Sequence, residues 1–435
     1  MTSPAPKRAS PDATSVRAAE STAALGVGVY VHFPWCIRKC PYCDFLSVPT
    51  ARADIPQERY ADAVLAELAL RRAELGPARL RSVFFGGGTP SLWNSAALGR
   101  VLQGVLAAFQ SGGEAPEITV ECNPGSLGYD KARALLDAGV NRLSIGVQGL
   151  DDERLRFLGR WHDAAQALES VRAAVRSGMP RVSADLIFGV AQESPETAAA
   201  EARRLIDLGL GHLSAYALTI EAQTAFGALA RKGRLPQAPE QAVAESFLAV
   251  DQVLTDLGLE HYETSNFARP GQRSEHNLGY WRGLDYVGLG CGAWGTLSGA
   301  GERFRYRNRP QPQGYMDTAL ELAGAPSPSD PASDPGALEA PRSELRALSH
   351  RLESEYEPLA PEVQLSEALM LGLRLAEGVD VEAASARTGA SFWSPARCRS
   401  AQRLIERGRL VADGPRLFIP KAAWLFADGI ISELW

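Results

Sequence analysis

Residues 29–48 read VYVHFPWCIRKCPYCDFLSV and contain three of the six cysteines of this 435-residue chain. Cys36, Cys40 and Cys43 follow the spacing C-x3-C-x2-C. Three thiols are an odd number for disulfides and one fewer than the four ligands of a structural zinc site. Iron–sulfur clusters are held by cysteine thiolates, usually four, so three would leave one iron of a cube without a protein ligand. The spacing therefore predicts a [4Fe-4S] cluster with one open iron.

Two other interpretations of the same cysteines stay open at this point. A zinc ion could take the three thiolates and a fourth ligand from elsewhere, such as His32. Alternatively, the three thiols have no common function.

The composition indicates a soluble globular protein, with 45% hydrophobic and 22% charged residues. The net charge of -6 weighs against a primary role in nucleic-acid binding, because the whole molecule does not attract a phosphate backbone. No apolar run of 18 residues occurs, so we expect no transmembrane segment. Residues 1–26 are polar and lack the apolar core of a signal peptide, which predicts a disordered tail and a cytoplasmic location with reduced thiols.

Short apolar runs alternate with stretches of helical period between residues 27 and 220. The expected strands are 28–33, 81–86, 117–122, 142–148, 181–189 and 213–220. The expected helices are 56–75, 95–109, 129–138, 151–177 and 195–208. Six β–α units in a row predict an α/β fold, a full or partial barrel of parallel strands with helices outside.

Polar residues stand where the expected strands end. The cysteines follow the first strand, GGGTP follows the second, and Glu121, Gln148 and Asp185 lie at or near the ends of later ones. Because ligands gather at the carboxyl ends of parallel strands, we expect these residues to share one rim.

The rest of the chain divides by composition. We expect a barrel domain over 27–235, an extension over 236–321, a disordered insertion rich in Pro, Ser, Ala and Asp over 322–345, and a C-terminal domain over 346–435. The C-terminal pattern of helices followed by a short hairpin predicts an α+β region that resembles a winged helix.

The cysteine loop after the first strand of a six-unit barrel resembles the radical S-adenosylmethionine superfamily. This resemblance implies a partial (β/α)6 radical SAM barrel, whose open iron chelates the methionine moiety of S-adenosylmethionine. It also implies that the glycines after the second strand bind the amino group of that moiety. The residues implied around the cofactor are Tyr30, Tyr42, Gly87, Gly88, Thr89, Glu121, Gln148, Arg160, Asp185 and Ala217.

The motifs YVHFPWCIRKCPYCDF, GGGTPS, ECNPG, ADLIFG, YETSNFARPG and HNLGYW resemble the oxygen-independent coproporphyrinogen III oxidase group within this superfamily. The oxidase carries a further cysteine two residues after the third, where this chain has Phe45. That difference and the short N-terminal region resemble the HemW branch of haem chaperones. The resemblance implies haem as cargo, apo-haemoproteins as recipients, including respiratory enzymes at the membrane, and no oxidase activity. The oxidase itself remains the alternative.

A haem carrier needs an axial ligand, and HNLGYW offers His276. A hydrogen-bonded structural histidine is the equal alternative. The family commonly has a second histidine where this chain has Trp294, which cannot ligate iron. Cys291 is a further thiolate candidate, with a small buried residue as its alternative.

The segment ERFRYRNRP at 302–310 interleaves arginines with aromatic residues. This pattern is typical of single-stranded nucleic-acid binding, of sites for haem propionates, or of a strand with one solvated basic face. The last interpretation is favoured, and we expect no nucleic-acid partner.

Overall fold

The computed structural model describes residues 26–110, 113, 115–299, 302–324 and 342–435. Residues 1–25 of the predicted tail and most of the predicted insertion lie outside these residues. Residues 322–324 and 342–345 of the predicted insertion are helical, at the end of α11 and the start of α12.

The six predicted strands form in the expected order because their Val, Ile, Leu and Phe side chains are buried. Twelve strands of the described residues form one sheet, ordered β14-β13-β12-β11-β1-β4-β5-β6-β7-β8-β10-β9. The strands from β11 to β8 in this order are mutually parallel. They are β11 (Tyr286–Leu289), β1 (Val27–Phe33), β4 (Leu80–Gly87), β5 (Glu117–Cys122), β6 (Arg142–Gln148), β7 (Arg181–Phe188) and β8 (His212–Ala217).

Antiparallel strands extend the sheet at both edges. They are β10 (Asn266–Ala268) and β9 (Glu260–Glu263) on one side, and β12 (Trp294–Gly299), β13 (Glu302–Asn308) and β14 (Glu353–Pro358) on the other. The sheet therefore continues across the predicted boundary between 27–235 and 236–321. The α/β fold with a mostly parallel sheet is confirmed.

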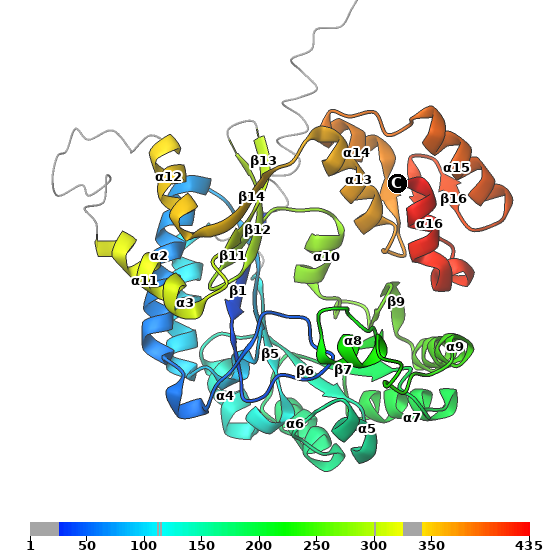
Figure 1. Ribbon diagram of the computed structural model, residues 1–435, viewed down its shortest axis with the longest axis horizontal. Helices are drawn as coiled ribbons and strands as arrows, with labels where there is room; N and C mark the ends of the chain where they lie inside the picture. Colours follow the sequence, from blue (N-terminus) through cyan, green and yellow to red (C-terminus); the bar gives the residue numbers. More distant parts are fainter. Residues whose placement is uncertain (1–25, 111–112, 114, 300–301, 325–341) are drawn as a thin grey trace, which may run out of the picture.

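Helices pack around the sheet, as Figure 1 shows. They are α2 (Gln57–Leu75), α3 (Ser95–Ala108), α4 (Tyr129–Asp137), α5 (Asp152–Phe157), α6 (Ala164–Arg176), α7 (Pro195–Ile206), α8 (Ala225–Ala230), α9 (Glu240–Asp256), α10 (Glu275–Trp281), α11 (Pro312–Gly324) and α12 (Arg342–Leu352).

The single helix expected over 151–177 is wrong, because two helices, α5 and α6, occupy this stretch. Gly159, with φ of +71°, turns the chain out of α5. Asp163 then starts α6 with a capping box to Gln166. The break between them holds Arg160, one of the predicted cofactor residues.

The C-terminal α+β region is also confirmed. It consists of α13 (Pro361–Gly372), β15 (Val379–Asp380), α14 (Val381–Thr388), α15 (Pro395–Glu406), β16 (Val411–Asp413), β17 (Arg416–Phe418) and α16 (Ala427–Leu434). Its three strands pair in the order β15-β17-β16 over a hydrophobic core separate from that of the barrel. Within the described part of the chain, no helix is long and apolar enough to span a membrane.

Candidate functional site

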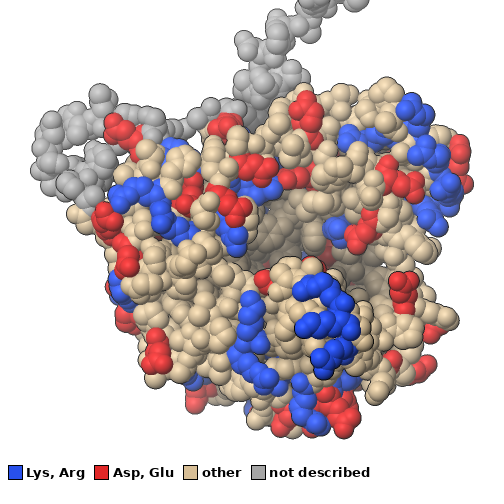
Figure 2. Space-filling view, in the orientation of Figure 1, with Lys and Arg blue, Asp and Glu red and all other residues tan. Residues whose placement is uncertain are grey.

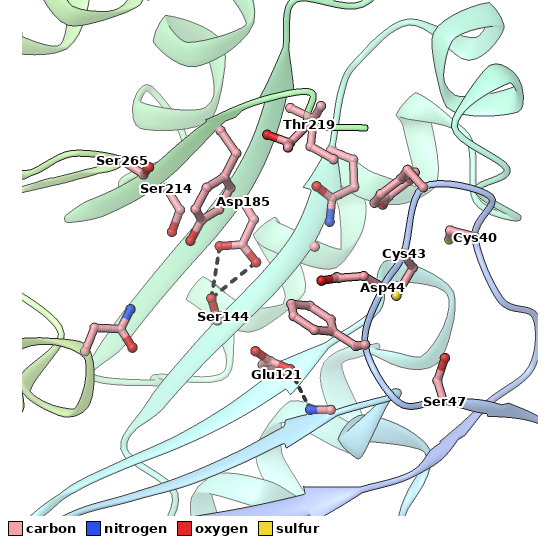
Figure 3. Close-up of a pocket in the computed structure, with 18 of the residues that line it drawn as sticks. Cys40, Cys43, Asp44, Ser47, Glu121, Ser144, Asp185, Ser214, Thr219 and Ser265 are labelled. Atoms are coloured by element: carbon pink, nitrogen blue, oxygen red, sulfur yellow. Dashed lines mark hydrogen bonds between the residues drawn. The ribbon is translucent and has the colours of Figure 1, made fainter. Parts of the chain in front are cut away.

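A cavity of about 1130 Å³ lies at the carboxyl ends of the parallel strands (Figure 3). Every residue predicted for the cluster or the cofactor lines it: Tyr30, Cys36, Cys40, Tyr42, Cys43, Gly87, Gly88, Thr89, Glu121, Gln148, Arg160, Asp185 and Ala217. His276 does not line it. The polar residues expected at the ends of the strands therefore do share one rim of the sheet.

The three cysteines lie on a loop that crosses the end of the barrel. Cys36 ends the short strand β2 (Trp35–Cys36), which pairs with β3 (Val48–Pro49) and so closes the loop on itself. Cys36 Sγ and Thr89 Oγ1 share a hydrogen bond of 3.2 Å. Arg160 Nη1 donates to Cys40 Sγ at 3.4 Å. A guanidinium beside a sulfur favours the thiolate, which is the form that binds metal.

Burial raises the pKa of the Cys36 thiol and raises that of Cys43 to about 11. Binding of a metal works against this effect, because a coordinated metal deprotonates a thiol outright. Among the described residues, no group of three or more His, Cys, Asp or Glu is arranged to hold a single metal ion. An iron–sulfur cube does not require such convergence, since each thiolate binds a different iron.

His32 does not fit the zinc alternative. Its Nδ1 shares a hydrogen bond with the Tyr30 hydroxyl at 2.9 Å, and its Nε2 with Leu46 O at 3.0 Å. Both ring nitrogens are therefore occupied, and the side chain ties the end of the cysteine loop to β1. The geometry of the loop favours the cluster interpretation.

Gly87, the last residue of β4, and Gly88 after it allow two backbones to approach closely. Gly87 has a φ of +109°, and a Cβ there would lie 2.5 Å from the His32 ring. A Cβ on Gly88 would lie 2.6 Å from Trp35 O. Gly88 N donates to Phe33 O at 2.8 Å, and Thr89 N to Trp35 O at 2.9 Å. The turn thus packs against the cysteine loop at positions where only glycine fits.

Two half-buried carboxylates face the cysteine loop across the cavity (Figure 3). Glu121 accepts a hydrogen bond from Gly87 N at 3.1 Å, and Asp185 accepts from Ser144 Oγ at 3.2 Å. Neither has an ion-pair partner among the residues that the structure describes. Burial, and then the charge of Asp185, raises the pKa of Glu121 to about 8. Such carboxylates suit a ligand that brings hydroxyl donors and positive charge, which S-adenosylmethionine does.

Gln148 and Arg160 complete this half of the cavity. Gln148 has a φ of +67°, which is uncommon for a residue other than glycine and typical of a functional position. Arg160 Nη2 donates to Gly146 O at 3.0 Å, which fixes the guanidinium beside Cys40. Tyr42 packs against Phe226 of α8, with ring centroids 6.4 Å apart.

The cofactor motifs did not predict the rest of the lining of this cavity, which is called here its second half. It is lined by Phe247, Thr264, Ser265, Asn277, Tyr280, Tyr286, Trp294, Arg307, Arg374, Trp424, Leu425 and Asp428. HNLGYW and ERFRYRNRP were singled out in the sequence and contribute Asn277, Tyr280 and Arg307. Arg374 and Trp424 carried no local signal, because only the packing of the C-terminal region against the barrel brings them here.

The mouth of this cavity lies beside a basic surface. Figure 2 shows the molecule hollowed between the barrel and the C-terminal part, with Lys and Arg gathered next to the hollow over α8. Arg231, Lys232 and Arg234 follow α8 and are exposed, and Arg38 and Lys39 line the cavity from the cysteine loop. The local charge here is opposite in sign to the net charge of the whole chain.

The residues that the sequence analysis considered for haem binding differ in their burial and in their hydrogen bonds. His276 is only 1% exposed, with Nδ1 bonded to Ser82 Oγ at 2.9 Å and Nε2 to the Tyr280 hydroxyl at 2.8 Å. This geometry favours the hydrogen-bonded alternative. Cys291 is fully buried, which favours a small core residue. Trp294 is 37% exposed on the cavity wall, with Arg307 over its ring at 5.4 Å.

The arginines of β13 are paired with neighbouring acids. Arg307 contacts Glu355 at 2.8 Å and Arg305 contacts Glu357 at 3.4 Å, both across to β14. The strand therefore presents neutralised pairs, and its basic appearance in the sequence gives no support to nucleic-acid binding.

Comparisons with known proteins agree with this geometry. Residues 30–205 match the model of the radical SAM superfamily, and residues 359–426 match the HemN C-terminal domain. The heme chaperone HemW of Escherichia coli is 39% identical over 292 residues, covering 67% of this chain and 75% of that protein. The heme chaperone HemW of Mycobacterium tuberculosis is 31% identical over 408 residues, covering 94% of each chain.

The chain belongs to the HemW family of the radical SAM superfamily. The structure of the coproporphyrinogen III oxidase HemN from Escherichia coli resembles it with a TM-score of 0.74 at 19% identity, covering 96% of this chain and 92% of that one. That likeness shows a shared fold. This member of the HemW family keeps the three cysteines and has Phe45 two residues after the last of them, 61% exposed at the cavity.

Proposed function

We propose that this member of the HemW family is a haem chaperone. It carries a [4Fe-4S] cluster and S-adenosylmethionine at the end of the barrel, binds haem in the adjoining half of the cavity, and passes haem to apo-haemoproteins. The observation that supports this most is the single cavity shared by the cysteine loop, the cofactor rim and an aromatic wall. At about 1130 Å³ it exceeds the roughly 300–1,000 Å³ of most small-molecule sites, so a second ligand has room.

The residues present fit the cluster and the cofactor. Cys36, Cys40 and Cys43 would hold the cluster, which when bound and reduced supplies the electron that cleaves S-adenosylmethionine. Glu121 would accept hydrogen bonds from the ribose hydroxyls, and Arg160 steadies the sulfur of Cys40. Gly87 and Gly88 let the turn pack directly against His32 and Trp35, next to the cysteine loop.

The proposed cargo and recipients rest on the family and on the cavity wall. The E. coli and M. tuberculosis relatives are named heme chaperones. Tyr280, Tyr286 and Trp294 give this half of the cavity an aromatic surface. Arg307 and Arg374 also line it, and each would bind a propionate in place of its present partner, Glu355 or Asp428. Recipients would be apo-haemoproteins in the cytoplasm or respiratory enzymes at the membrane.

One experiment separates this function from the oxidase alternative. The cluster is reconstituted anaerobically, and haem titration and coproporphyrinogen turnover are measured on the same sample. We expect saturable haem binding without decarboxylation. Turnover without haem binding would refute the chaperone function, and Phe45→Cys tests in parallel whether the missing fourth cysteine accounts for the lack of turnover.

A further inference from the structure

Exposed apolar side chains gather where the cavity opens to solvent. Ile37, Phe45, Trp294 and Leu425 line the cavity, and between 37% and 61% of each residue is exposed. They come from the cysteine loop, from β12 and from the 3-10 helix η4 (Lys421–Phe426), so separate parts of the chain contribute to one surface. Single exposed apolar residues are ordinary, whereas a group of them around one opening is typical of an interaction site.

Two basic segments border the same opening. One is the cysteine loop and the other is the turn that follows α8. Their exposed cations, called here the basic rim, are Arg38, Lys39, Arg231, Lys232 and Arg234. The two segments adjoin, because Phe226 N of α8 donates to Pro41 O of the cysteine loop at 2.8 Å. Figure 2 shows Lys and Arg over α8 beside the hollow of the molecule.

The basic rim has no acidic partner of its own. Among the described residues, none of its five cations forms an ion pair. Lys39 Nζ donates to Phe45 O at 2.9 Å and Arg231 to Ala222 O, so backbone carbonyls and not carboxylates meet these two cations. The acids on the same two segments are Asp44 and Glu221. The cations are therefore in the majority, and their charge is available to a partner.

We propose that the basic rim is the docking surface for the protein that receives haem, and that this recipient presents carboxylates around its own empty haem crevice. The inference rests on the proposed haem-chaperone function and assigns the surface used in transfer. Haem that leaves the cavity passes its mouth, and a recipient seated there keeps the apolar macrocycle out of water. Opposite charges on the two proteins speed their encounter and fix their relative orientation.

The shape of this surface favours a protein over an anionic membrane. The apolar side chains lie on the wall of a hollow, which the convex edge of a protein can enter and a flat bilayer cannot (Figure 2). The cations stand on two short segments and not along one face of a long amphipathic helix, which is the usual membrane-surface device. An apolar centre with a charged border is the usual composition of a protein–protein interface.

The test measures the rate of haem transfer from the full-length, cluster-loaded and haem-loaded protein to a designed recipient. The recipient is a de novo four-helix bundle with a bis-histidine haem site, made with either Glu or Lys around its open end. At low salt, the wild type should transfer haem to the Glu bundle roughly tenfold or more faster than to the Lys bundle. The rate should rise with the concentration of the bundle, and added salt should reduce the difference between the two bundles.

The variant that tests the rim is Arg231→Glu/Lys232→Glu/Arg234→Glu. These three residues are exposed and do not line the cavity, so the variant should bind haem and retain its cluster like the wild type. Its transfer rate to the Glu bundle should fall roughly tenfold or more, and its rate to the Lys bundle should rise, because the attraction and the repulsion are exchanged. Recovery with the Lys bundle also shows that the variant is folded.

A matched control reverses as many charges elsewhere, on exposed residues of α7 and α15. It is Arg203→Glu/Arg204→Glu/Arg399→Glu. This control should transfer haem to the Glu bundle at nearly the wild-type rate. A similar loss in the control and in the rim variant would show that only the net charge matters, which would overturn the assignment of the surface.

The other outcomes are also decisive. Equal rates to the two bundles, or a rate that does not depend on the concentration of the bundle, would overturn the docking surface while leaving haem binding intact. Equal rates to both bundles, together with sedimentation on phosphatidylserine vesicles that the rim variant loses, would assign the rim to a membrane instead. A wild type that binds no haem would refute the proposed function, and this inference with it.

Discussion

At the residue scale, Glu121 and Asp185 are the most distinctive groups of the cavity. Both carboxylates are half-buried, and they accept hydrogen bonds from a backbone N–H and a serine hydroxyl. Because burial and the neighbouring Asp185 raise the pKa of Glu121 to about 8, most of the ligand-free protein has this carboxyl protonated at neutral pH. A ligand that needs the carboxylate must therefore displace a proton.

We expect the affinity for S-adenosylmethionine to depend on pH through Glu121. Hydroxyl donors and the sulfonium charge favour the ionised form, so the pKa of Glu121 falls in the complex and binding releases a proton below about pH 8. The Kd should fall as pH rises from about 6 to 8, by up to roughly tenfold per unit, and level off above. Equilibrium dialysis over this range measures it.

Glu121→Gln provides the control, with weaker binding and a flat pH profile. The raised pKa of Glu121 also affects the stability of the ligand-free protein. The free energy of unfolding should fall as pH rises from about 4.5 towards 8, because the folded state holds the proton more tightly than the unfolded chain. A wild-type Kd for S-adenosylmethionine that stays constant or rises between about pH 6 and 8 would contradict this role of Glu121.

A methyl group on Gly88 should disturb the site more than the fold. A Cβ there lies 2.6 Å from Trp35 O, so Gly88→Ala must push the turn away from the cysteine loop. We expect a stability loss of about 1–3 kcal/mol by urea unfolding and a markedly lower cluster content after reconstitution. Gly314→Ala in α11, where nothing lies within 4 Å of the added Cβ, should leave the cluster content unchanged. Equal cluster content in both variants would show that the turn does not support the loop.

At the scale of secondary-structure elements, Arg71 of α2 connects its own helix with two strands at the edge of the sheet, β13 and β14. It contacts Glu353 of β14 at 2.7 Å, Glu67 at 3.3 Å and Asn308 Oδ1 at 3.0 Å, and it lies 3.7 Å above the ring of Tyr306. The whole side chain is buried. The long-range contacts of this one side chain thus attach β13 and β14 to α2.

Arg71→Met should destabilise the protein by about 3–5 kcal/mol, because it leaves the buried carboxylate of Glu67 without its cation and leaves Glu353 with Arg346 alone among the arginines. Arg100→Met is the matched control, since Arg100 pairs with Asp62 at the surface, where an ion pair contributes at most about 1 kcal/mol. Urea unfolding of the two variants measures the difference. A similar loss for both would mean that the buried network contributes no more than a surface pair.

The strands and the rim could be predicted because their signals are local. Apolar runs that end in Glu121, Gln148 or Asp185 follow directly from the sequence, and parallel pairing then brings these ends together. The break around Arg160 was missed, since one glycine in a helical pattern is only a weak stop signal. The pairing of β11 with β1 was also missed, because strand order between segments more than 250 residues apart depends on packing and leaves no local pattern.

The hydrogen-bond partners of His276 could not be predicted from the sequence for a similar reason. The motif indicated a histidine of interest, but its two hydrogen-bond partners come from β4 and from its own helix. Only the folded arrangement shows that Tyr280 stands between this histidine and the cavity.

At the scale of the whole molecule, the barrel and the C-terminal part share one cavity. The barrel supplies the cofactor rim, and Arg374, Trp424 and Asp428 reach it from the C-terminal part. The Trp424 ring meets His261 of β9 at 4.3 Å, and Lys421 pairs with Asp251 of α9 at 3.0 Å. Ligands bound in the two halves should therefore protect different segments of the chain from hydrogen exchange.

Hydrogen exchange should distinguish the segments that S-adenosylmethionine protects from those that haem protects. S-adenosylmethionine is expected to slow exchange in the cysteine loop, in the Gly87 turn and at the end of β5. Haem is expected to slow exchange in α10 and in residues 421–428, because these segments border the second half of the cavity. The middle of α15 should be unaffected by either ligand. Haem protection confined to α15 or to the outer helices would contradict a shared cavity.

The most direct measurement is the metal and sulfide content of anaerobically purified and reconstituted protein. The three thiolates predict about four iron and four sulfide ions per chain, a brown chromophore, and an electron paramagnetic resonance signal of the reduced cluster that changes when S-adenosylmethionine is added. Substitution of Cys36, Cys40 or Cys43 by Ser should abolish all of these, while Cys398→Ser should not. Protein without iron or sulfide, with zinc bound to the cysteine loop, would contradict the account.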